Sequence, residues 1–261
     1  MEIKSTKDFN LAMVNYYNTL PFTFGLKEID DFNMIMDIPS KCMGHFQRGD
    51  ADIALVPVAT LINQNNYRII TDYCIGCEGE VRTVAVFSKT DIRDVKKIYL
   101  DQDSRTSQLL VKILCRNYWK IDPQFEQTNV RKIDIKDISE DTAILMIGDK
   151  VFDVEGTFEF EYDLGEIWRK MTGLPFTFAV WIARENVPES IIEDLNKSLS
   201  IGVNDIQGVI EQNQHLDLRF NLNDYFKKHI DYHFDKAKKE ALKLYYDYAE
   251  EIFNHAMTTG F

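Results

Sequence analysis

The sequence of 261 residues contains no apolar run that approaches the roughly 18 residues of a membrane-spanning helix. Its opening segment, MEIKSTKDFN, is charged and lacks the apolar core of a signal peptide. The length and the hydrophobic content of 45% suffice for one large domain or for two smaller lobes. These features predict a soluble, cytoplasmic protein that has no membrane partner.

Positive charge is scarce, because 30 lysines and arginines stand against 42 aspartates and glutamates and leave a formal net charge of −12. No basic face stands out in the sequence, and a broad contact with the phosphates of nucleic acid requires one. A nucleic-acid partner is therefore not expected. A small anion would have to be held by local donors, such as the backbone amides at helix N-termini.

Three common catalytic signatures are absent. The chain has no GxSxG nucleophile elbow, no GxxxxGK[ST] phosphate loop and no GxGxxG dinucleotide motif. Serine hydrolases, nucleoside triphosphatases and nicotinamide-dependent dehydrogenases are thereby disfavoured.

The metal-binding patterns are incomplete. Cys74 and Cys77 form a CIGC motif without the second cysteine pair of a zinc site. His229 and His233 are four residues apart on a predicted helix, but Ile230 stands where a zinc protease has glutamate. We therefore predict no metal site, and we expect the four cysteines to remain reduced thiols.

Buried strands alternate with helices along most of the chain. Apolar runs predict strands at 9–18, 52–58, 67–77, 83–89, 97–101, 142–149 and 176–184. Continuous apolar strands of this kind are typical of parallel sheets covered by helices. Helices are predicted at 40–47, from Ser104 or Thr106 onward, at 162–173, and from 188 to the C-terminus, with Asn223 and Asp235 as N-caps. The fold class is therefore α/β, with a helical C-terminal segment.

The motif DQDSRTSQLL carries the strongest local chemical signal. Ser104, Thr106 and Ser107 stand where a predicted strand gives way to a helix, so unpaired amides and the helix dipole would favour an anion there. Asp101 and Asp103 weaken a phosphate assignment and favour a small carboxylate. Ordinary N-capping by serine or threonine explains the same residues equally well.

The pentapeptide LPFTF occurs twice, at 20–24 and at 174–178. The flanking sequences share no pattern, so a tandem duplication is not indicated. Both copies border loops at the ends of predicted strands, where ligands bind in open α/β sheets. This placement favours two similar loops that face one object.

Six segments in order resemble the menaquinone-biosynthesis chorismate dehydratases of the futalosine route. They are VNYYNTLPFTFGL, GDADIALVPVATL, CEGEVRTVAVFSK, LDQDSRTSQLLVKIL, LMIGDKVF and YDLGEIWRKMTGLPFTFAVW, and the resemblance spans roughly Met13 to Ala183. The sister enzyme of that route, which forms the dihydroxynaphthoate ring, is similar around TGLP and YDLG. Its opening motif differs from YYNTLP.

The resemblance implies a periplasmic-binding-protein type II-like fold, in which two crossing strands join two α/β lobes. We place the crossings at 83–89 and 176–183, lobe one at 1–88 and 181–261, lobe two at 89–180, and the ligand cleft between the lobes. The implied reaction removes water from chorismate and gives 3-[(1-carboxyvinyl)oxy]benzoate, which is the work of a carbon–oxygen hydro-lyase without a cofactor. The expected partners are the small dicarboxylate substrate and, in a homodimer, a second copy of the chain.

The implied chemistry assigns roles to residues of the predicted loops. Asn18 and Thr83 are the candidate catalytic residues, and Thr83 stands where the family resemblance leads us to expect serine. No histidine falls in these loops, so we expect the enolpyruvyl carboxylate of the substrate to take the C3 proton. The candidate substrate-binding residues are Tyr17, Thr19, Val81, Arg82, Ser104, Thr106, Ser107, Asp149, Gly173 and Leu174, and Asp149 alternatively braces lobe two.

Other functions fit the same fold. A non-catalytic protein that binds small carboxylates would need an export signal or a lipidated cysteine, and the sequence shows neither. The dihydroxynaphthoate-forming lyase is disfavoured by the opening motif. An effector-sensing regulator would need a helix-turn-helix module, for which there is no room before Phe9.

Overall fold

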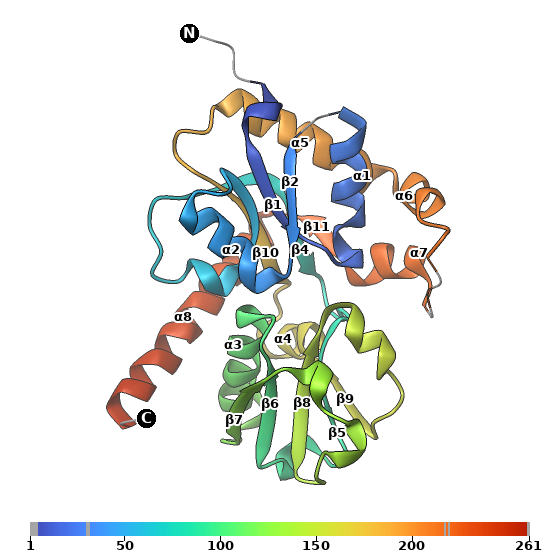
Figure 1. Cartoon of the computed structure of the whole chain (residues 1–261). Helices are drawn as coiled ribbons and strands as arrows, with labels where there is room; N and C mark the ends of the chain where they lie inside the picture. Colours follow the sequence, from blue (N-terminus) through green and yellow to red (C-terminus); the bar gives the residue numbers. More distant parts are fainter. Residues whose placement is uncertain (1–4, 30–31, 217, 219, 260–261) are drawn as a thin grey trace. The chain divides into compact units, whose positions relative to one another are not determined.

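A computed structural model describes residues 5–29, 32–216, 218 and 220–259, and it confirms the α/β class (Figure 1). The chain forms two compact units. The first comprises Met1–Gly76 and Thr177–Asp235, and the second comprises Cys77–Phe176 and Lys236–Phe261. The chain therefore passes from one unit to the other three times. Within the described part of the chain, no helix is both long and apolar enough to cross a membrane.

The first unit is built on a mixed sheet of order β11-β4-β10-β3-β1-β2. Strand β1 runs parallel to β2 and β3, whereas β10 runs antiparallel to β3, and β11 antiparallel to β4. The strands are β1 (Asn10–Val14), β2 (Asn33–Asp37), β3 (Ile53–Pro57), β4 (Arg68–Cys77), β10 (Phe176–Ala183) and β11 (Asp231–His233). The helices are α1 (Leu20–Ile29), α2 (Pro39–Arg48), α5 (Glu189–Asn204), α6 (Ile206–Gln212) and α7 (Leu222–Asp224).

The second unit contains a sheet of order β7-β6-β8-β5-β9. Strand β6 is parallel to β7 and β8, whereas β5 is antiparallel to both of its neighbours. The strands are β5 (Val84–Ser88), β6 (Lys97–Asp101), β7 (Gln124–Thr128), β8 (Thr142–Ile147) and β9 (Phe160–Asp163). The helices are α3 (Arg105–Leu114), α4 (Leu164–Thr172) and α8 (Lys236–Thr259).

The apolar runs predicted β1, β3, β4, β5, β6, β8 and β10, but they missed β2, β7, β9 and β11 and did not predict the strand directions. Every residue of β3, β5 and β8 is buried, as expected. Strand β5 nevertheless pairs antiparallel on both sides, so the expectation that these apolar strands belong to parallel sheets is wrong for β5. An all-apolar strand requires cover on both faces, and a mixed sheet flanked by helices gives that cover as well as a parallel sheet does.

The division of the chain differs from the expected lobes 1–88 with 181–261 and 89–180. The first crossing lies at the end of β4 rather than in the segment 83–89, because β5 pairs with β8 and β9 of the second unit. Helix α8 also belongs to the second unit. Its Tyr245 ring packs against Trp168 and Phe176, and its Tyr245 hydroxyl donates to the Thr106 carbonyl at 3.1 Å. The crossing expected at 176–183 does lie at the start of β10.

The segment that contains the two histidines is not a continuous helix. Residues Asp231–His233 form β11, which pairs antiparallel with β4, and Tyr232 is buried there. The predicted N-cap Asn223 lies inside α7, whose cap is Asn221. Helical i,i+4 spacing therefore does not apply to His229 and His233. The described residues include no group of three or more side chains that could hold a metal ion.

The two LPFTF copies adopt different structures. The first copy begins α1 directly after a short 3-10 turn at Tyr17–Thr19. In the second copy, Leu174 and Pro175 follow the end of α4, and the remaining residues open β10 with Phe176 and Phe178 buried. The expectation of two similar loops is therefore wrong. Proline is tolerated in the first turn of a helix as well as ahead of a strand, so the surrounding structure decides whether the pentapeptide forms a helix or a strand.

Helices α1 and α5 touch through their backbones. A β-carbon on Gly25 would overlap the Ser198 carbonyl oxygen, and one on Gly202 would overlap the Pro21 carbonyl oxygen. Glycine is required at both positions because the helices approach too closely for any side chain. This contact fixes the first turn of α1, which follows the Tyr17–Thr19 turn.

We expect Gly25→Ala to lower the free energy of unfolding by about 1–3 kcal/mol, because the added methyl overlaps rigid backbone. Alanine would otherwise stabilise a helix interior by about 1 kcal/mol. The matched control is Gly44→Ala in α2, where a β-carbon would meet only the flexible end of Arg48 at 3.1 Å. Urea unfolding measures both variants. Equal stability of Gly25→Ala and the wild type would contradict the close contact.

Candidate functional site

One edge of the second sheet gathers most of the predicted second-unit residues. Val84 at the start of β5 pairs with Ile147 at the end of β8, and Ala85 pairs with Asp163 at the end of β9. Strand β6 is parallel to β8, so it also ends at this edge. The Gly148 amide donates to the Thr83 carbonyl at 2.8 Å. Thr83, the Ser104–Ser107 turn and the Gly148–Asp149 turn therefore share one edge of the sheet.

The turn at Ser104 combines capping with a cluster of buried hydroxyls. Ser104 is the N-cap of α3, and its Oγ accepts the Ser107 amide at 3.2 Å. The Ser104 and Ser107 hydroxyl oxygens are 3.0 Å apart, and both residues are buried. The cap uses one of the four amides that a helix leaves without an intrahelical partner at its start. Capping is confirmed, whereas anion binding at this helix terminus stays a prediction.

The loop ahead of Thr83 is held by a carboxylate of the protein itself. Asp163 accepts the Val81 amide at 3.1 Å on both of its oxygens and the Arg82 amide at 2.6 Å. It also caps α4 by accepting the Glu166 amide at 2.9 Å. The amide hydrogens of Val81 and Arg82 are thus directed to Asp163. A substrate carboxylate would have to displace it to use these two donors.

The Arg82 side chain is engaged as well. Its Nε and Nη2 donate to Glu155 in a bidentate pair, both at 2.9 Å, and its guanidinium lies 5.2 Å from the Phe152 ring centre. The Arg82 backbone is left-handed at φ 68°, an unusual conformation for a residue with a side chain. Arg82 therefore shapes the loop with its backbone and pairs with Glu155 through its side chain.

Burial raises the pKa of the Asp163 carboxyl to about 6, although the amides of Glu166, Val81 and Arg82 favour the ionised form. The charge of Glu80 raises this pKa further. Asp163 consequently titrates closer to neutrality than an ordinary aspartate, whose pKa is near 3.8.

A buried ion-pair triad closes the same edge of the second sheet. Lys150 Nζ lies 2.5 Å from Asp101 Oδ2 and 2.8 Å from Asp103 Oδ2. Lys150 is 6% exposed and Asp101 is 1% exposed, and Asp101 also accepts the Ile147 amide at 3.2 Å. Both aspartates of the DQDSRTSQLL motif therefore pair with the single positive charge of Lys150. They brace the ends of β6 and β8.

The first unit positions the predicted residues Tyr17, Asn18 and Thr19 in the 3-10 turn between β1 and α1. The Thr19 hydroxyl is within hydrogen-bond distance of the Val14 carbonyl at 2.8 Å and of the Tyr16 carbonyl at 2.9 Å, so it holds the turn. The Asn18 carbonyl accepts the Tyr232 hydroxyl at 2.9 Å. Asn18 Oδ1 is buried and has no hydrogen-bond partner among the described residues.

Gly173 and Leu174 lie at the other end of α4 from Asp163. Gly173 adopts φ 74°, and its amide donates to the Arg169 carbonyl at 2.8 Å, which ends the helix as the sequence predicted. The Leu174 amide donates to Thr172 Oγ1 at 3.1 Å. The nine residues of α4 separate these positions from Asp163 by roughly 13 Å. Gly173 and Leu174 thus stand apart from the shared sheet edge.

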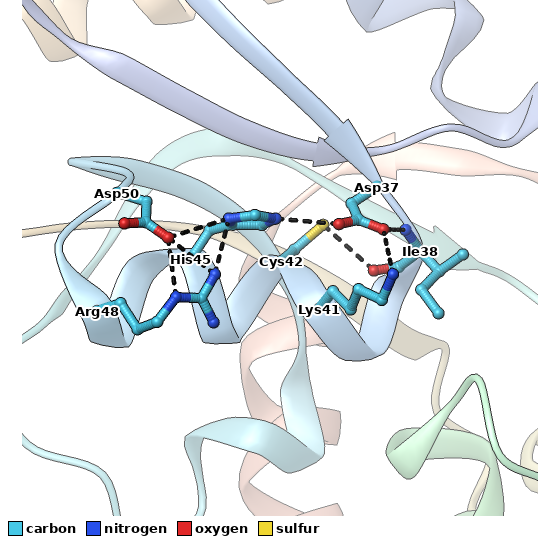
Figure 2. Close-up of polar contacts among 7 residues, drawn as sticks. All are labelled: Asp37, Ile38, Lys41, Cys42, His45, Arg48 and Asp50. Carbon is cyan, nitrogen blue, oxygen red and sulfur yellow. Dashed lines mark hydrogen bonds and ion pairs between the residues drawn. The ribbon is translucent and has the colours of Figure 1, made fainter.

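Figure 2 shows the histidine network of the first unit, which adjoins the end of β2. His45 Nε2 lies 3.0 Å from Asp37 Oδ2, and Arg48 Nη2 lies 3.0 Å from His45 Nδ1. Asp50 Oδ2 lies 3.4 Å from the same Nδ1. Both ring nitrogens are engaged, so His45 ties α2 to its flanking strands. It does not present a base.

The thiol in this network is inert. The Cys42 thiol donates to the Ile38 carbonyl at 3.6 Å, and burial raises its pKa to about 12 (Figure 2). The four cysteines are buried and free, and a thiol with the raised pKa of Cys42 is a poor nucleophile at neutral pH.

Sequence reasoning missed the roles of Asp163 and Lys150. An aspartate directly before a helix is an N-cap signal, so the capping of α4 could have been predicted from YDLGE. The amides that Asp163 also accepts are 81 and 82 residues away, and no local pattern indicates them. Nothing in the local sequence distinguishes Lys150 from a solvated surface lysine, and only the fold brings it between two aspartates.

Comparison with known proteins gives a match along nearly the whole chain. The profile of the family described as Menaquinone biosynthesis matches residues 9–251. A chorismate dehydratase from Thermus thermophilus is 23% identical over 260 residues, which cover 92% of this chain and 94% of that protein.

Solved structures support the fold. A structural-genomics protein from Archaeoglobus fulgidus superposes with a TM-score of 0.68 at 15% identity, over 93% of this chain and 97% of that one. An ABC transporter from Parabacteroides distasonis gives 0.60 at 14% identity, over 93% and 92%. A Candida albicans protein described as having the generic periplasmic binding protein fold gives 0.56 at 12%, over 94% of each chain. The periplasmic-binding-protein-like fold is confirmed.

The raised pKa of Asp163 predicts a specific pH dependence. The folded protein binds this proton more tightly than the unfolded chain does, so the contribution of Asp163 to stability increases as pH falls through about 6. Relative to Asp163→Asn, which does not titrate, the wild type should gain roughly 1 kcal/mol of unfolding free energy between pH 7 and pH 5. Urea unfolding at the two pH values measures this difference.

Asp141→Asn is the control for that experiment. The hydroxyl of Ser139, with a smaller contribution from Lys96, lowers the pKa of the exposed Asp141 carboxyl, so it titrates below 3.8. The stability difference between the wild type and Asp141→Asn should therefore stay constant from pH 7 to pH 5. A wild-type advantage over Asp163→Asn that shrinks on acidification would mean that the amide bonds outweigh burial at Asp163.

Proposed function

Because this chain belongs to the menaquinone-biosynthesis family, we propose that it is a chorismate dehydratase, a carbon–oxygen lyase that gives 3-[(1-carboxyvinyl)oxy]benzoate. The named relative from Thermus thermophilus, which shares 23% identity over 92% of the chain, supports this assignment. The reaction removes the C3 proton and the C4 hydroxyl of the substrate. It makes the ring aromatic, and this supplies a large driving force.

The observation that carries the proposal is the unpartnered Oδ1 of Asn18. A buried acceptor without a donor destabilises a protein by about 1–3 kcal/mol, so its retention suggests a ligand. Chorismate has a single hydroxyl, at C4, and this hydroxyl is the group that leaves. Asn18 Oδ1 would accept its hydrogen and so orient the C4–O bond for cleavage.

The residues at the edge of the second sheet suit the two carboxylates of the substrate. The Ser104 and Ser107 hydroxyls stand at a helix N-terminus, where the amides and the dipole favour a negative charge. The Thr83 hydroxyl supplies a further donor. Holding the ring carboxylate with such donors stabilises the charge that develops as C3 loses its proton.

The base is then the substrate itself. Lys150 pairs with Asp101 and Asp103, and three backbone amides hold Asp163. We propose that the enolpyruvyl carboxylate takes the C3 proton. The electrons of the C3–H bond form the new C3–C4 double bond, the C4–O bond breaks, and the departing hydroxide leaves as water after receiving a proton.

Incubation of the purified protein with chorismate tests the assignment. Chromatography should show chorismate disappearing and an aromatic product accumulating, whose mass is that of chorismate less one water. If the protein is a catalyst, each protein molecule should convert many molecules of chorismate. Binding of chorismate without product would indicate a non-catalytic carboxylate-binding protein of the same fold and would contradict the proposal.

Asn18→Ala should reduce kcat about 100-fold, because the acceptor for the leaving hydroxyl is lost. The stability of the free protein should not fall, since Oδ1 has no partner among the described residues. The control is Asn196→Ala, whose side chain accepts the Asp72 amide at 3.0 Å. That variant should lose some stability and keep its turnover. Full turnover by Asn18→Ala would show that the role given to Asn18 is wrong.

A further inference from the structure

Besides Asn18 Oδ1, three buried side-chain atoms of the first unit have no hydrogen-bond partner among the described residues, namely Arg68 Nε, Thr177 Oγ1 and Trp181 Nε1. Thr177 in β10 is 1% exposed, and its hydroxyl makes no hydrogen bond to any described residue. Other buried threonines of this unit use their hydroxyls. Thr60, for example, donates to the Pro57 carbonyl at 2.6 Å. A threonine hydroxyl that stays buried without a partner is destabilising, whereas valine would fill the same volume without this penalty.

Strand geometry places Thr177 on the face of β10 that α1 covers. Thr177 and Trp181 are four residues apart in one strand, so they point to the same face. The Trp181 ring centre lies 5.7 Å from that of Phe22 in α1. Phe22 in turn lies 5.3 Å from Tyr232, whose hydroxyl donates to the Asn18 carbonyl. A chain of direct contacts thus connects this face of β10 to the Asn18 turn.

The register brings Thr177 to the end of the sheet at which β1 leads into the Asn18 turn. Ala179 near the start of β10 pairs with Pro57 at the end of β3. Strand β1 is parallel to β3, with Ala12 opposite Ala54, so it ends at the same edge and leads into the turn that holds Asn18. Thr177 and the Asn18 turn therefore lie at one edge of the first sheet, and Asn18 Oδ1 and Thr177 Oγ1 are both buried without a hydrogen-bond partner among the described residues. Trp181 Nε1 also lacks a partner, but it lies further along β10 from this edge.

We propose that Thr177 is a further substrate-binding residue, which donates its hydroxyl hydrogen to the C4 hydroxyl oxygen while that hydroxyl donates to Asn18. This inference rests on the proposed dehydratase function. A hydroxyl both donates and accepts, so it satisfies an amide oxygen and a threonine hydroxyl together. A carboxylate has no hydrogen to give to Asn18 Oδ1. The pair therefore selects the hydroxyl end of the substrate and directs the carboxylates elsewhere.

The same contact assists the reaction. As the C4–O bond breaks, negative charge develops on the departing oxygen, and a donor already aimed at that atom stabilises it. Thr177 keeps its own proton in this step. The leaving oxygen receives the proton that the enolpyruvyl carboxylate took from C3, and water is released.

Thr177→Val tests the inference, because it removes only the hydroxyl. We expect its melting temperature to match or exceed that of the wild type, and kcat/KM for chorismate to fall about tenfold or more. Thr177→Ser keeps the hydroxyl and should recover most of the activity. Inhibition by the product, which has no C4 hydroxyl, should be equally strong in the wild type and in Thr177→Val.

The matched control is Thr142→Val in the second unit. Thr142 is buried at the start of β8, and its hydroxyl lies 2.8 Å from that of Ser139. This variant should lose stability and keep its kcat/KM.

Three outcomes would overturn the inference. A destabilised Thr177→Val would mean that the hydroxyl has a structural partner in the free protein. An unchanged kcat/KM would exclude contact with the substrate, and the dehydratase assignment would stand. Inhibition by product that weakens in parallel with kcat/KM would place the hydroxyl against another part of the ligand. Failure of the wild type to convert chorismate would instead refute the proposed function itself.

Discussion

The carboxylate of Asp163 is the interaction on which the second unit's site depends. Asp163 is the last residue of β9. It accepts the amides of Val81 and Arg82 in the loop that leads into β5 and the amide of Glu166 in the first turn of α4, so it joins these three parts of the chain. Next to it, a β-carbon on Gly165 would meet the Gly79 carbonyl oxygen and the Cys77 sulfur. The loop therefore lies directly on the first turn of α4, and this contact sets the position of Thr83.

This arrangement uses an anion-binding motif for structure. Backbone amides near a helix N-terminus commonly bind a ligand's phosphate or carboxylate. Here the protein supplies the carboxylate itself, and the left-handed Arg82, which is strained by roughly 1 kcal/mol or more, is stabilised by the bond from its own amide. The helix terminus at Ser104 is then the better candidate for a substrate carboxylate, because a serine caps it and no acidic residue does.

Local sequence predicted the elements whose signals are local. The buried runs of β3, β5, β6, β8 and β10 were evident, and Gly173 ended α4 where the pattern placed it. Strand β11 was missed because three residues form it only by pairing with β4, which lies far away in the sequence. The first LPFTF copy was misjudged for a related reason. Its helix is fixed by the contact of Gly25 with α5, and no feature of the pentapeptide reveals that partner.

The residues of the candidate site also divide into those that local sequence reveals and those that only the fold reveals. Hydroxyls at a helix start are visible in DQDSRTSQLL, and the structure places Ser104 and Ser107 together. The partners of the nearby acids are not visible, since Lys150 comes 49 residues after Asp101 in the chain and looks like a surface lysine. Sequence also gives no indication of which buried polar atoms remain without partners. That property depends on every neighbouring side chain at once.

The distribution of charge resolves an apparent conflict between a net charge of −12 and the proposed dianionic substrate. A ligand responds mainly to the charges near it, and solvent screens the distant ones within about 10 Å. At the edge of the second sheet, Lys150 offsets one of the two negative charges of Asp101 and Asp103, and three backbone amides donate to Asp163. The lysine and the amides reduce, but do not cancel, the negative charge that opposes an anion at the Ser104 turn. The acidic excess of the chain is compatible with a carboxylate site because the acids nearest to it are already occupied in holding the fold.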